Sequence, residues 1–374
     1  MISRWAWAEV STAAIEHNVR VLSDAVAPSQ LWAVVKANGY GHDAVTAARA
    51  ALRGGAAGLC VALVQEGVQL RAAGIDAPIL VLSEQPAATL ADAIRNQLQL
   101  TVYSVGHVAA IAGAGGVDVP VHLKVDSGMH RVGAAERDAM IVADSVAASG
   151  ATRLAGVFTH LAVADSPDDP YTLEQLARFD AALARLASAG HRPVLVHAAN
   201  SAGAIAHPGA RYGMVRAGIA IYGISPGRGV DPLCRALGLQ PALSLKAKVS
   251  FVKRLAAGDR ISYGLRHRFE QDTTVATVPI GYADGVSRRL HAVDGAVLIR
   301  GVRRRIVGVV TMDQMMVDCG DDVVEVGDEV VLIGEQWSDG TVHRITAEEW
   351  ADRLDTIAYE VLCGISSRVE RCTV

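Results

Sequence analysis

The sequence is poor in cysteine and lacks the patterns that form a disulfide framework or hold a zinc ion. It has five cysteines, and no two of them make a C-x-x-C pair. Scattered cysteines of this kind suit a reducing cytosol and argue against a structural metal site. We therefore expect a protein without a bound metal.

Long apolar runs and basic blocks are also absent from the sequence. No run of about 20 apolar residues is present, and the segment MISRWAWAEV lacks the apolar core of a secretory signal. The formal net charge is −4 and the isoelectric point is about 6.3, which argues against nucleic acid as a partner. We expect a cytoplasmic protein with no membrane association.

What the sequence does contain is apolar material arranged in a regular alternation. Hydrophobic residues make up 51% of the 374 residues, enough for a barrel of about 250 residues and a smaller domain. Short apolar runs alternate with helical stretches through the first two thirds of the chain, and eight such units predict a (β/α)8 barrel. The expected strands are Leu31–Val35, Gly58–Ala62, Pro78–Leu82, Leu100–Tyr103, Val121–Val125, Leu154–Phe158, Val194–His197 and Tyr212–Arg216.

The last third of the chain has a different character. Segments rich in Val, Ile and Thr are separated by Gly-Asp and Asp-Gly turns, which predicts a mostly-β domain with one short helix capped by Thr346. We place the barrel at residues 1–238 and the β domain at residues 239–374. The expected strands of the β domain are Leu245–Lys253, Thr273–Val278, Ala296–Ile299, Ile306–Thr311 and Glu329–Ile333.

Lys36 stands at the end of the first apolar run, in AVVKANGYGH. An ammonium at such a junction loses hydration, which favours the neutral amine that condenses with an aldehyde to form a Schiff base. A lysine whose head group simply reaches water from a strand end is the alternative. The other strand ends help to decide between the two.

Polar side chains gather at the carboxyl ends of the predicted strands, where such barrels carry their chemistry. Besides Lys36 and Tyr40 they include Lys124, Asp126, His130, Arg131, His160, His197, Asn200, Ser201 and Arg216. The loops after the last two strands, with Ser201 and Gly218-Ile219, suit a phosphate bound by backbone N–H groups. A cofactor that offers both an aldehyde and a phosphate is pyridoxal 5′-phosphate, PLP.

A series of motifs resembles the bacterial alanine racemases over essentially the whole chain. They occur in the family's order, and the resemblance implies a PLP enzyme that interconverts L- and D-alanine, with D-alanine used for peptidoglycan. The motifs are AVVKANGYGH, HLKVDSGMHRVG, FTHLAVAD, HAANSAG, MVRAGIAIYG, ISYG, IGYADG, MDQ and YEVLCGIS.

The resemblance also implies roles for individual residues. Lys36 would carry the cofactor as an imine and act as one base, and Tyr263 would be the second base. Arg216 would face the pyridine nitrogen, with His160 supporting it. Further cofactor contacts would come from Tyr40, Leu82, Arg131, Asn200, Ser201, Gly218, Ile219 and Tyr359. Arg131 and Met312 would bind the substrate carboxylate, and Asp165, Tyr282 and Arg288 would line the entrance.

Lys124 matches a lysine that relatives carry as a carbamate, which would give Arg131 an anionic partner. An unmodified strand lysine is the alternative. The sequence departs from the family at Val309, where relatives usually have an arginine, and at Ser367, where a tyrosine is common.

In relatives, the β domain of one subunit covers the barrel of the other, so the resemblance implies a homodimer with shared active sites. Three other functions stay open: a racemase of another small amino acid such as serine, a PLP decarboxylase of related fold, and a non-catalytic PLP carrier. A hydrophobic pocket discriminates poorly against one added hydroxyl group, so alanine and serine are the two substrates that are hardest to distinguish.

Overall fold

A computed structural model describes residues 4–374 of the chain, which divide into two units. The barrel unit comprises residues 13–39 and 43–240, and the β unit comprises residues 4–12, 40–42 and 241–374. The boundary predicted between residues 238 and 239 lies close to residue 240. Residues 6–10, which the sequence analysis assigned to the barrel domain, instead form a strand in the sheet of the β unit.

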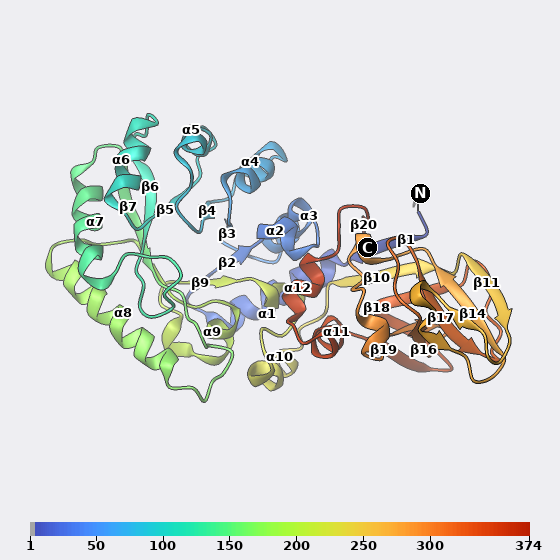
Figure 1. Cartoon of the computed structure of the whole chain (residues 1–374). Helices are drawn as coiled ribbons and strands as arrows, with labels where there is room; N and C mark the ends of the chain where they lie inside the picture. The colour runs from blue at the N-terminus through green and yellow to red at the C-terminus, as the bar shows by residue number, and fades with distance from the viewer. Residues whose placement is uncertain (1–3) are drawn as a thin grey trace. The chain divides into compact units, whose positions relative to one another are not determined.

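The barrel unit is built around eight parallel strands (Figure 1). Their order is β4-β3-β2-β9-β8-β7-β6-β5, and a bridge between Leu80 and Gln99 joins the two end strands. The predicted (β/α)8 barrel is confirmed, and every expected strand lies within two residues of its predicted bounds. The strands are β2 (Gln30–Val34), β3 (Gly58–Val61), β4 (Ile79–Val81), β5 (Leu100–Val102), β6 (Val119–Lys124), β7 (Thr152–Phe158), β8 (Leu195–His197) and β9 (Met214–Ala217).

Helices alternate with these strands and pack their apolar faces on the outside of the barrel. In α1 the apolar face is buried, since Ile15, Val19, Leu22 and Val26 are each at most 1% exposed. Each such side chain contributes about 1.5–3 kcal/mol by leaving water. The helices are α1 (Thr12–Val26), α2 (Lys36–Tyr40), α3 (Ala44–Arg53), α4 (Val64–Ala72), α5 (Ala87–Arg95), α6 (Val105–Gly113), α7 (Glu136–Ala148), α8 (Tyr171–Ser188), α9 (Ser201–Ala206) and α10 (Asp231–Ala236).

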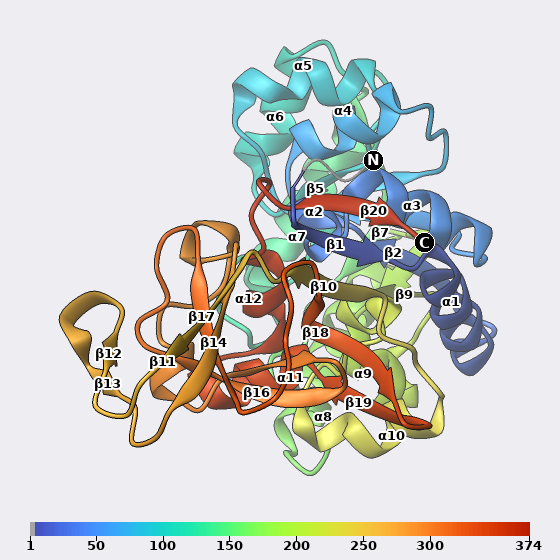
Figure 2. The same ribbon diagram turned by 90° about the vertical axis from the view of Figure 1, so that its right-hand side faces the viewer.

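The β unit contains a twisted sheet of ten strands and a separate two-stranded hairpin (Figure 2). The sheet order is β11-β14-β17-β16-β15-β18-β10-β1-β20, with β19 paired to β18. The strands are β1 (Ala6–Val10), β10 (Leu243–Lys248), β11 (Phe251–Leu255), β14 (Thr273–Val278), β15 (Ala296–Ile299), β16 (Val302–Val307), β17 (Met315–Gly320), β18 (Glu329–Ser338), β19 (Thr341–Ile345) and β20 (Glu370–Thr373). The hairpin consists of β12 (Arg260–Ile261) and β13 (His267–Arg268).

Two predictions for the β unit need correction, and one is confirmed. The segment 245–253, expected as one strand, breaks at Val249 because β10 pairs with β1 and β18 whereas β11 pairs with β14. The segment 306–311 is strand only to Val307. The helix expected at Thr346 is α11 (Ala347–Leu354), and the Thr346 hydroxyl accepts from the Glu349 N–H at 3.1 Å as predicted. A further helix, α12 (Ala358–Cys363), follows it.

Within residues 4–374, no helix combines the length and the apolar character needed to cross a membrane.

Candidate active site

Cationic side chains gather at one end of the barrel, where the parallel strands have their carboxyl ends. Lys36 follows β2, Lys124 is the last residue of β6, and Arg216 lies in β9. Arg216, Arg131 and Lys36 all act electrostatically on Lys124, so the four cations lie near one another. The convergence predicted from the strand ends is thus present within the barrel unit.

Lys36 begins a turn that the backbone holds in an unusual conformation. Ala37, Asn38 and Gly39 are all left-handed, with φ of 53°, 52° and 64°. Consecutive residues of this kind persist only where their surroundings fix them. The Glu66 carboxylate accepts from the Ala37 N–H at 2.6 Å, and it also accepts from two N–H groups at the start of α4. Glu66 therefore ties the turn that carries Lys36 to the next strand–helix connection.

Arg216 is buried, being 3% exposed, and no carboxylate pairs with it among the described residues. Its guanidinium donates to the carbonyls of Thr159 and Ala198 at 2.9 and 3.0 Å, and it contacts the Nδ1 atoms of His197 and His160 at 2.7 and 3.2 Å. Burial lowers the pKa of Arg216 to about 10, which still leaves the group protonated at neutral pH. The cation is held by neutral acceptors alone.

A chain of hydrogen bonds extends from Arg216 through two buried histidines to the partly buried Gln99. His197 Nε2 lies 2.9 Å from His122 Nδ1, and His122 Nε2 lies 2.7 Å from Gln99 Oε1. Because arginine can only donate, His197 Nδ1 is the acceptor of its hydrogen bond. The Nε2–H of His197 then donates to His122 Nδ1, and the Nε2–H of His122 donates to Gln99 Oε1. Burial and the Arg216 charge lower the pKa of His122 to about 3 and that of His197 well below its ordinary value. Both rings are neutral, and the tautomer of His197 leaves its Nδ1 free to accept the hydrogen bond from the Arg216 guanidinium.

Lys124 is almost fully buried, at 5% exposed, with its Nζ 5.6 Å from the centre of the Phe158 ring. Burial, reinforced by Arg216, Arg131 and Lys36, lowers the pKa of Lys124 to about 8, although Asp126 acts in the opposite direction. The same burial and cations lower the pKa of His160 well below its usual value. The rim therefore carries an excess of positive charge.

The loops after β8 and β9 meet at Ser201. Its hydroxyl accepts from the backbone N–H of Gly218 at 2.8 Å and of Ala220 at 3.3 Å. Asn200 caps α9, and its Oδ1 accepts from the Gly203 N–H at 2.9 Å. The predicted meeting of these two loops is thus present, with a hydroxyl and backbone amides side by side.

The remaining predicted residues of the barrel unit also follow strands. The Leu82 N–H, just after β4, donates to the Val61 carbonyl at 2.9 Å. Ile219 is fully buried in the turn after β9. Asp165 lies against Gly227, where an added Cβ would be 2.7 Å from the Asp165 Cβ. Arg131 is exposed.

Tyr263 lies in the β unit, in the turn of the β12–β13 hairpin, and is 71% exposed. It lines an open cavity of about 590 Å³ together with Lys253, Thr311, Gln314 and Met316. Met312, in the neighbouring MDQ turn, is 52% exposed, and its carbonyl accepts from the Ala283 N–H at 3.0 Å. Two predicted substrate-contacting residues, Tyr263 and Met312, thus belong to adjoining turns of one unit.

Tyr40 and Tyr359 also belong to the β unit and contact each other. Their ring centres are 5.9 Å apart, with the planes tilted by 51°. The turn at Tyr40 packs tightly on α12, because a Cβ added at Gly41 would lie 2.3 Å from the Leu362 carbonyl oxygen. The Gly41 carbonyl accepts from Arg371 Nε at 3.0 Å. Glycine is required at this close approach, and the two predicted phosphate-binding tyrosines are brought together.

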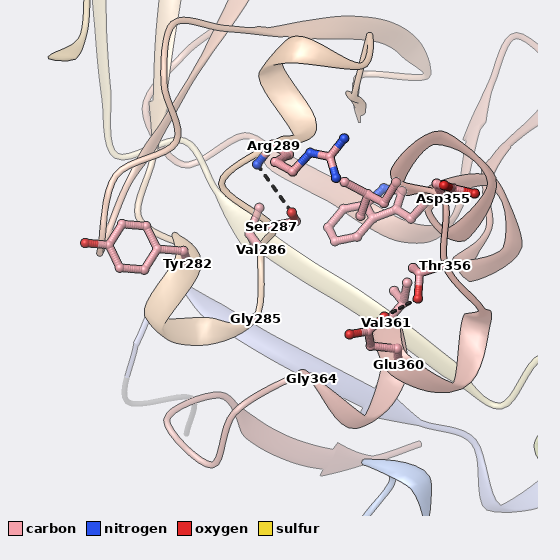
Figure 3. A pocket seen from close by; sticks show the side chains of 12 residues that line it. Tyr282, Gly285, Val286, Ser287, Arg289, Asp355, Thr356, Glu360, Val361 and Gly364 are labelled. Atoms are coloured by element: carbon pink, nitrogen blue, oxygen red, sulfur yellow. Dashed lines mark hydrogen bonds between the residues drawn. The ribbon is translucent and has the colours of Figure 1, made fainter. Parts of the chain in front are cut away.

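Tyr282, one of the predicted entrance residues, lines a second cavity of the β unit, of about 490 Å³ (Figure 3). Ser287 and Arg289 lie on one side of this cavity, and Thr356 and Glu360 lie on the other. Arg288 is exposed and is not among the residues that line it.

The position at which relatives usually have an arginine is buried in this chain. Val309 is 1% exposed. The three arginines just before this position each form an ion pair with an acid: Arg303 with Glu349, Arg304 with Asp322 and Arg305 with Asp294.

Three residues that support the site were not identified from the sequence, namely Glu66, Gln99 and His122. His122 could have been found, since it precedes Lys124 by two positions and side chains at this spacing share one face of a strand. Glu66 and Gln99 gave no signal, because a helix-start glutamate and a lone glutamine are common.

The donor chemistry of the barrel rim fits an anionic, phosphate-bearing cofactor. Lys36, Lys124, Arg131 and Arg216 outnumber Asp126, the acid that acts on Lys124. Ser201 and the amides around it add neutral donors of the kind that bind phosphate. A buried arginine without an acidic partner suits a neutral acceptor nitrogen.

Comparison with known proteins gives a consistent answer over the whole chain. The family described as "Alanine racemase, N-terminal domain" matches residues 10–226, and "Alanine racemase, C-terminal domain" matches residues 242–373. An alanine racemase of Symbiobacterium thermophilum is 48% identical, covering 98% of this chain and 97% of that protein. One of Thermobifida fusca is 43% identical, covering 99% and 98%. A crystal structure of the Bacillus anthracis alanine racemase with bound L-Ala-P is 38% identical, with a TM-score of 0.93 over 100% of this chain and 96% of that one.

Proposed function

The chain belongs to the alanine racemase family of PLP-dependent isomerases, and we propose from this premise how its own residues perform the reaction. The observation that carries the proposal is the cationic barrel rim, in which Lys36 and Lys124 share one end of the barrel with the buried Arg216. The reaction removes the α-proton of alanine on one face and returns a proton on the other.

Lys36 would hold PLP covalently, and the cofactor phosphate would be bound by Tyr40, Ser201, Gly218, Ile219 and Tyr359. Leu82, Arg131, His160 and Asn200 would complete the cofactor contacts. When bound, PLP withdraws electrons from the amino acid and acidifies its α-proton. Support for this assignment comes from the excess positive charge and from the hydroxyl and backbone amides that meet at Ser201.

Two bases on opposite faces of the substrate account for reaction in both directions. Lys36 Nζ would exchange the proton of D-alanine, and Tyr263 Oη would exchange that of L-alanine. Arg131 and the Met312 backbone amide would hold the substrate carboxylate, and Asp165, Tyr282 and Arg288 would line the entrance. Tyr263 lines an open cavity, which supports its access to a substrate.

Arg216 would control the course of the reaction. It keeps its proton at neutral pH, since its pKa of about 10 lies far above neutrality. It can therefore donate a hydrogen bond to the cofactor nitrogen without transferring a proton. His197 and His122 are neutral and cannot supply one either.

We further propose that the protein is a homodimer in which Tyr263 serves the partner's barrel. The 71% exposure of Tyr263 within one chain supports this arrangement. We also propose that Lys124 is carbamylated, that the enzyme works in the cytoplasm, and that it supplies D-alanine for peptidoglycan.

A single incubation tests the assignment of substrate and cofactor. Purified protein with PLP should convert L-alanine to a racemic mixture, measured by chiral chromatography, with L-serine and other single amino acids run in parallel. Borohydride treatment followed by peptide mapping should fix the cofactor on Lys36. Modification of a different lysine, or no racemisation of alanine, would overturn the proposal.

A further inference from the structure

Ser262, which precedes Tyr263, has a backbone conformation that is almost confined to glycine. Its φ is 66° and its ψ is −178°. A residue with a Cβ persists there only when its surroundings fix it, and such residues concentrate at functional sites. The contacts of Ser262 should therefore explain how this conformation is held.

Two hydrogen bonds hold Ser262 in this conformation. Its hydroxyl donates to the Val309 carbonyl at 2.7 Å, and its own carbonyl accepts from the Leu265 N–H at 3.0 Å. The first bond joins the hairpin to the segment after β16, and the second closes the hairpin turn. Residue 262 is thus fixed on both its side-chain and main-chain sides.

Gly308 allows the chain to pack closely against Ser262, and the preceding residue, Ile261, is anchored in a core. A Cβ added at Gly308 would lie 2.7 Å from the Ser262 Cβ, and Gly308 itself has a φ of 66°. Ile261 is 7% exposed and packs in a small core with Phe269, Val275 and Val307. The rigid part of the hairpin therefore ends at Ser262.

Tyr263 begins where this rigid part ends. Its side chain is 71% exposed, and the β12–β13 hairpin projects from the edge of the β unit (Figure 2). The following residues, Gly264 and Leu265, are also left-handed, with φ of 72° and 44°. With little packed against the phenol ring, the backbone at residue 262 is the feature that fixes the point from which the ring projects.

We propose that Ser262 is the positioning residue for Tyr263. Its hydroxyl, bonded to the Val309 carbonyl, holds the backbone in the conformation that aims the phenol. The Val309 side chain takes no part, because only its carbonyl is used. This inference rests on the proposed role of Tyr263 as the base for L-alanine.

Two substitutions of Ser262 separate positioning from folding. Ser262→Ala removes the hydroxyl but keeps the Cβ that disfavours the conformation, whereas Ser262→Gly removes both. We expect kcat to fall about 10-fold to 100-fold in each variant, the effect of a misplacement of about 1 Å. Thermal stability should fall in Ser262→Ala and be retained in Ser262→Gly, which tolerates a positive φ.

Ser29→Ala is the matched control. The Ser29 hydroxyl also donates to a backbone carbonyl, that of Tyr212 at 2.6 Å, but it stands before β2, at the barrel end opposite Lys36. This variant loses the same kind of bond away from the site and should keep wild-type kcat and KM.

Deuterium at the α-carbon gives a readout that a purely structural role would leave unchanged. Slower proton transfer at Tyr263 should raise the isotope effect on kcat/KM for L-alanine and lower it for D-alanine, where the Lys36 step comes first. Unchanged isotope effects in Ser262→Gly would overturn the inference even if kcat fell. If Tyr263→Phe still exchanged the L-alanine proton, the role of Tyr263 itself would fail instead.

Discussion

In the proposed mechanism, Arg216 determines the fate of the acidified substrate, because it offers a hydrogen bond but keeps its proton. Arg216→Glu would place an acid between His197 and His160, and a carboxylic acid can transfer its proton to a neighbouring nitrogen. We expect racemisation to slow on the order of 100-fold, as on loss of an oriented cationic donor. We also expect the side reaction that forms pyruvate to rise, measured with a pyruvate-specific assay.

The variant Arg216→Met controls for simple disruption of the pocket. A methionine there also loses the contacts to Thr159 and Ala198 but introduces no acid. Racemisation should slow in it without extra pyruvate. Equal pyruvate formation in the two variants would rule out this explanation of reaction specificity.

Lys124 gives a prediction with a defined pH direction. Its pKa is lowered from the ordinary 10.5 to about 8 by burial and the neighbouring cations. Only the neutral amine reacts with carbon dioxide, so at constant carbon dioxide the carbamate should increase as pH rises toward 8 and above. Carbon-13 NMR of protein equilibrated with labelled carbon dioxide should show a carbamate signal with this pH dependence.

Lys124→Met identifies the modified residue, because it keeps an unbranched side chain of similar length without the amine. The carbamate signal should be absent from this variant at every pH. A wild-type sample without the signal, or a variant that retains it, would show that Lys124 is unmodified or that another lysine reacts.

The residues that could be predicted from the sequence are those whose chemistry is unusual for their place in the chain. Lys36 ends a buried apolar run, and Arg216 lies inside a strand, so each is conspicuous locally. Gln99 and Glu66 could not be predicted, since their importance comes from partners 23 and 29 positions away in the chain. Hydrogen bonds between separate loops leave no periodic pattern.

The turn from Lys36 to Tyr40 depends on the start of α4. Glu66 accepts three backbone N–H groups, one from Ala37 and two from Ala62 and Leu63. Glu66→Ala should reduce the free energy of unfolding by about 2 kcal/mol, because bonds to a charged acceptor are lost. It should also weaken PLP binding, since the left-handed turn at Lys36 is released. Urea denaturation and cofactor titration measure the two effects.

Glu174→Ala is the control, because Glu174 is a glutamate of α8 that forms an exposed ion pair with Arg178, one turn later on the same helix. Removing it should change stability by less than about 0.5 kcal/mol and leave PLP binding unchanged. An equal effect of the two substitutions would show that Glu66 has no special role in the Lys36 turn.

The barrel strands were predictable because a buried parallel strand is a continuous apolar run between turns. The topology of the β unit was not, because antiparallel pairing joins segments far apart in the chain. β1 gave no such signal, since its partners β10 and β20 lie more than 200 residues later. The division of residues 245–253 between β10 and β11 also depends on partners rather than on local composition.

In the molecule as a whole, the two proposed bases belong to different units. Lys36 is in the barrel unit, and Tyr263 is in the β unit, exposed at the turn of a hairpin. Periodicity and propensity describe one chain at a time, so they could not reveal which copy of Tyr263 serves a given Lys36. The family resemblance supplied that expectation, and subunit mixing can test it.

Mixing two inactive variants distinguishes a shared site from one formed within a single chain. Lys36→Ala and Tyr263→Phe each lack one base, so neither homodimer has a complete site. If sites are shared, random exchange gives hybrids with one intact site of two, and activity should recover to about a quarter of the wild-type value. Differently tagged subunits, isolated as the hybrid by sequential affinity steps, give the direct measurement. A hybrid of confirmed composition that stays inactive would mean that Tyr263 serves the barrel of its own chain, because each chain then lacks a base of its own.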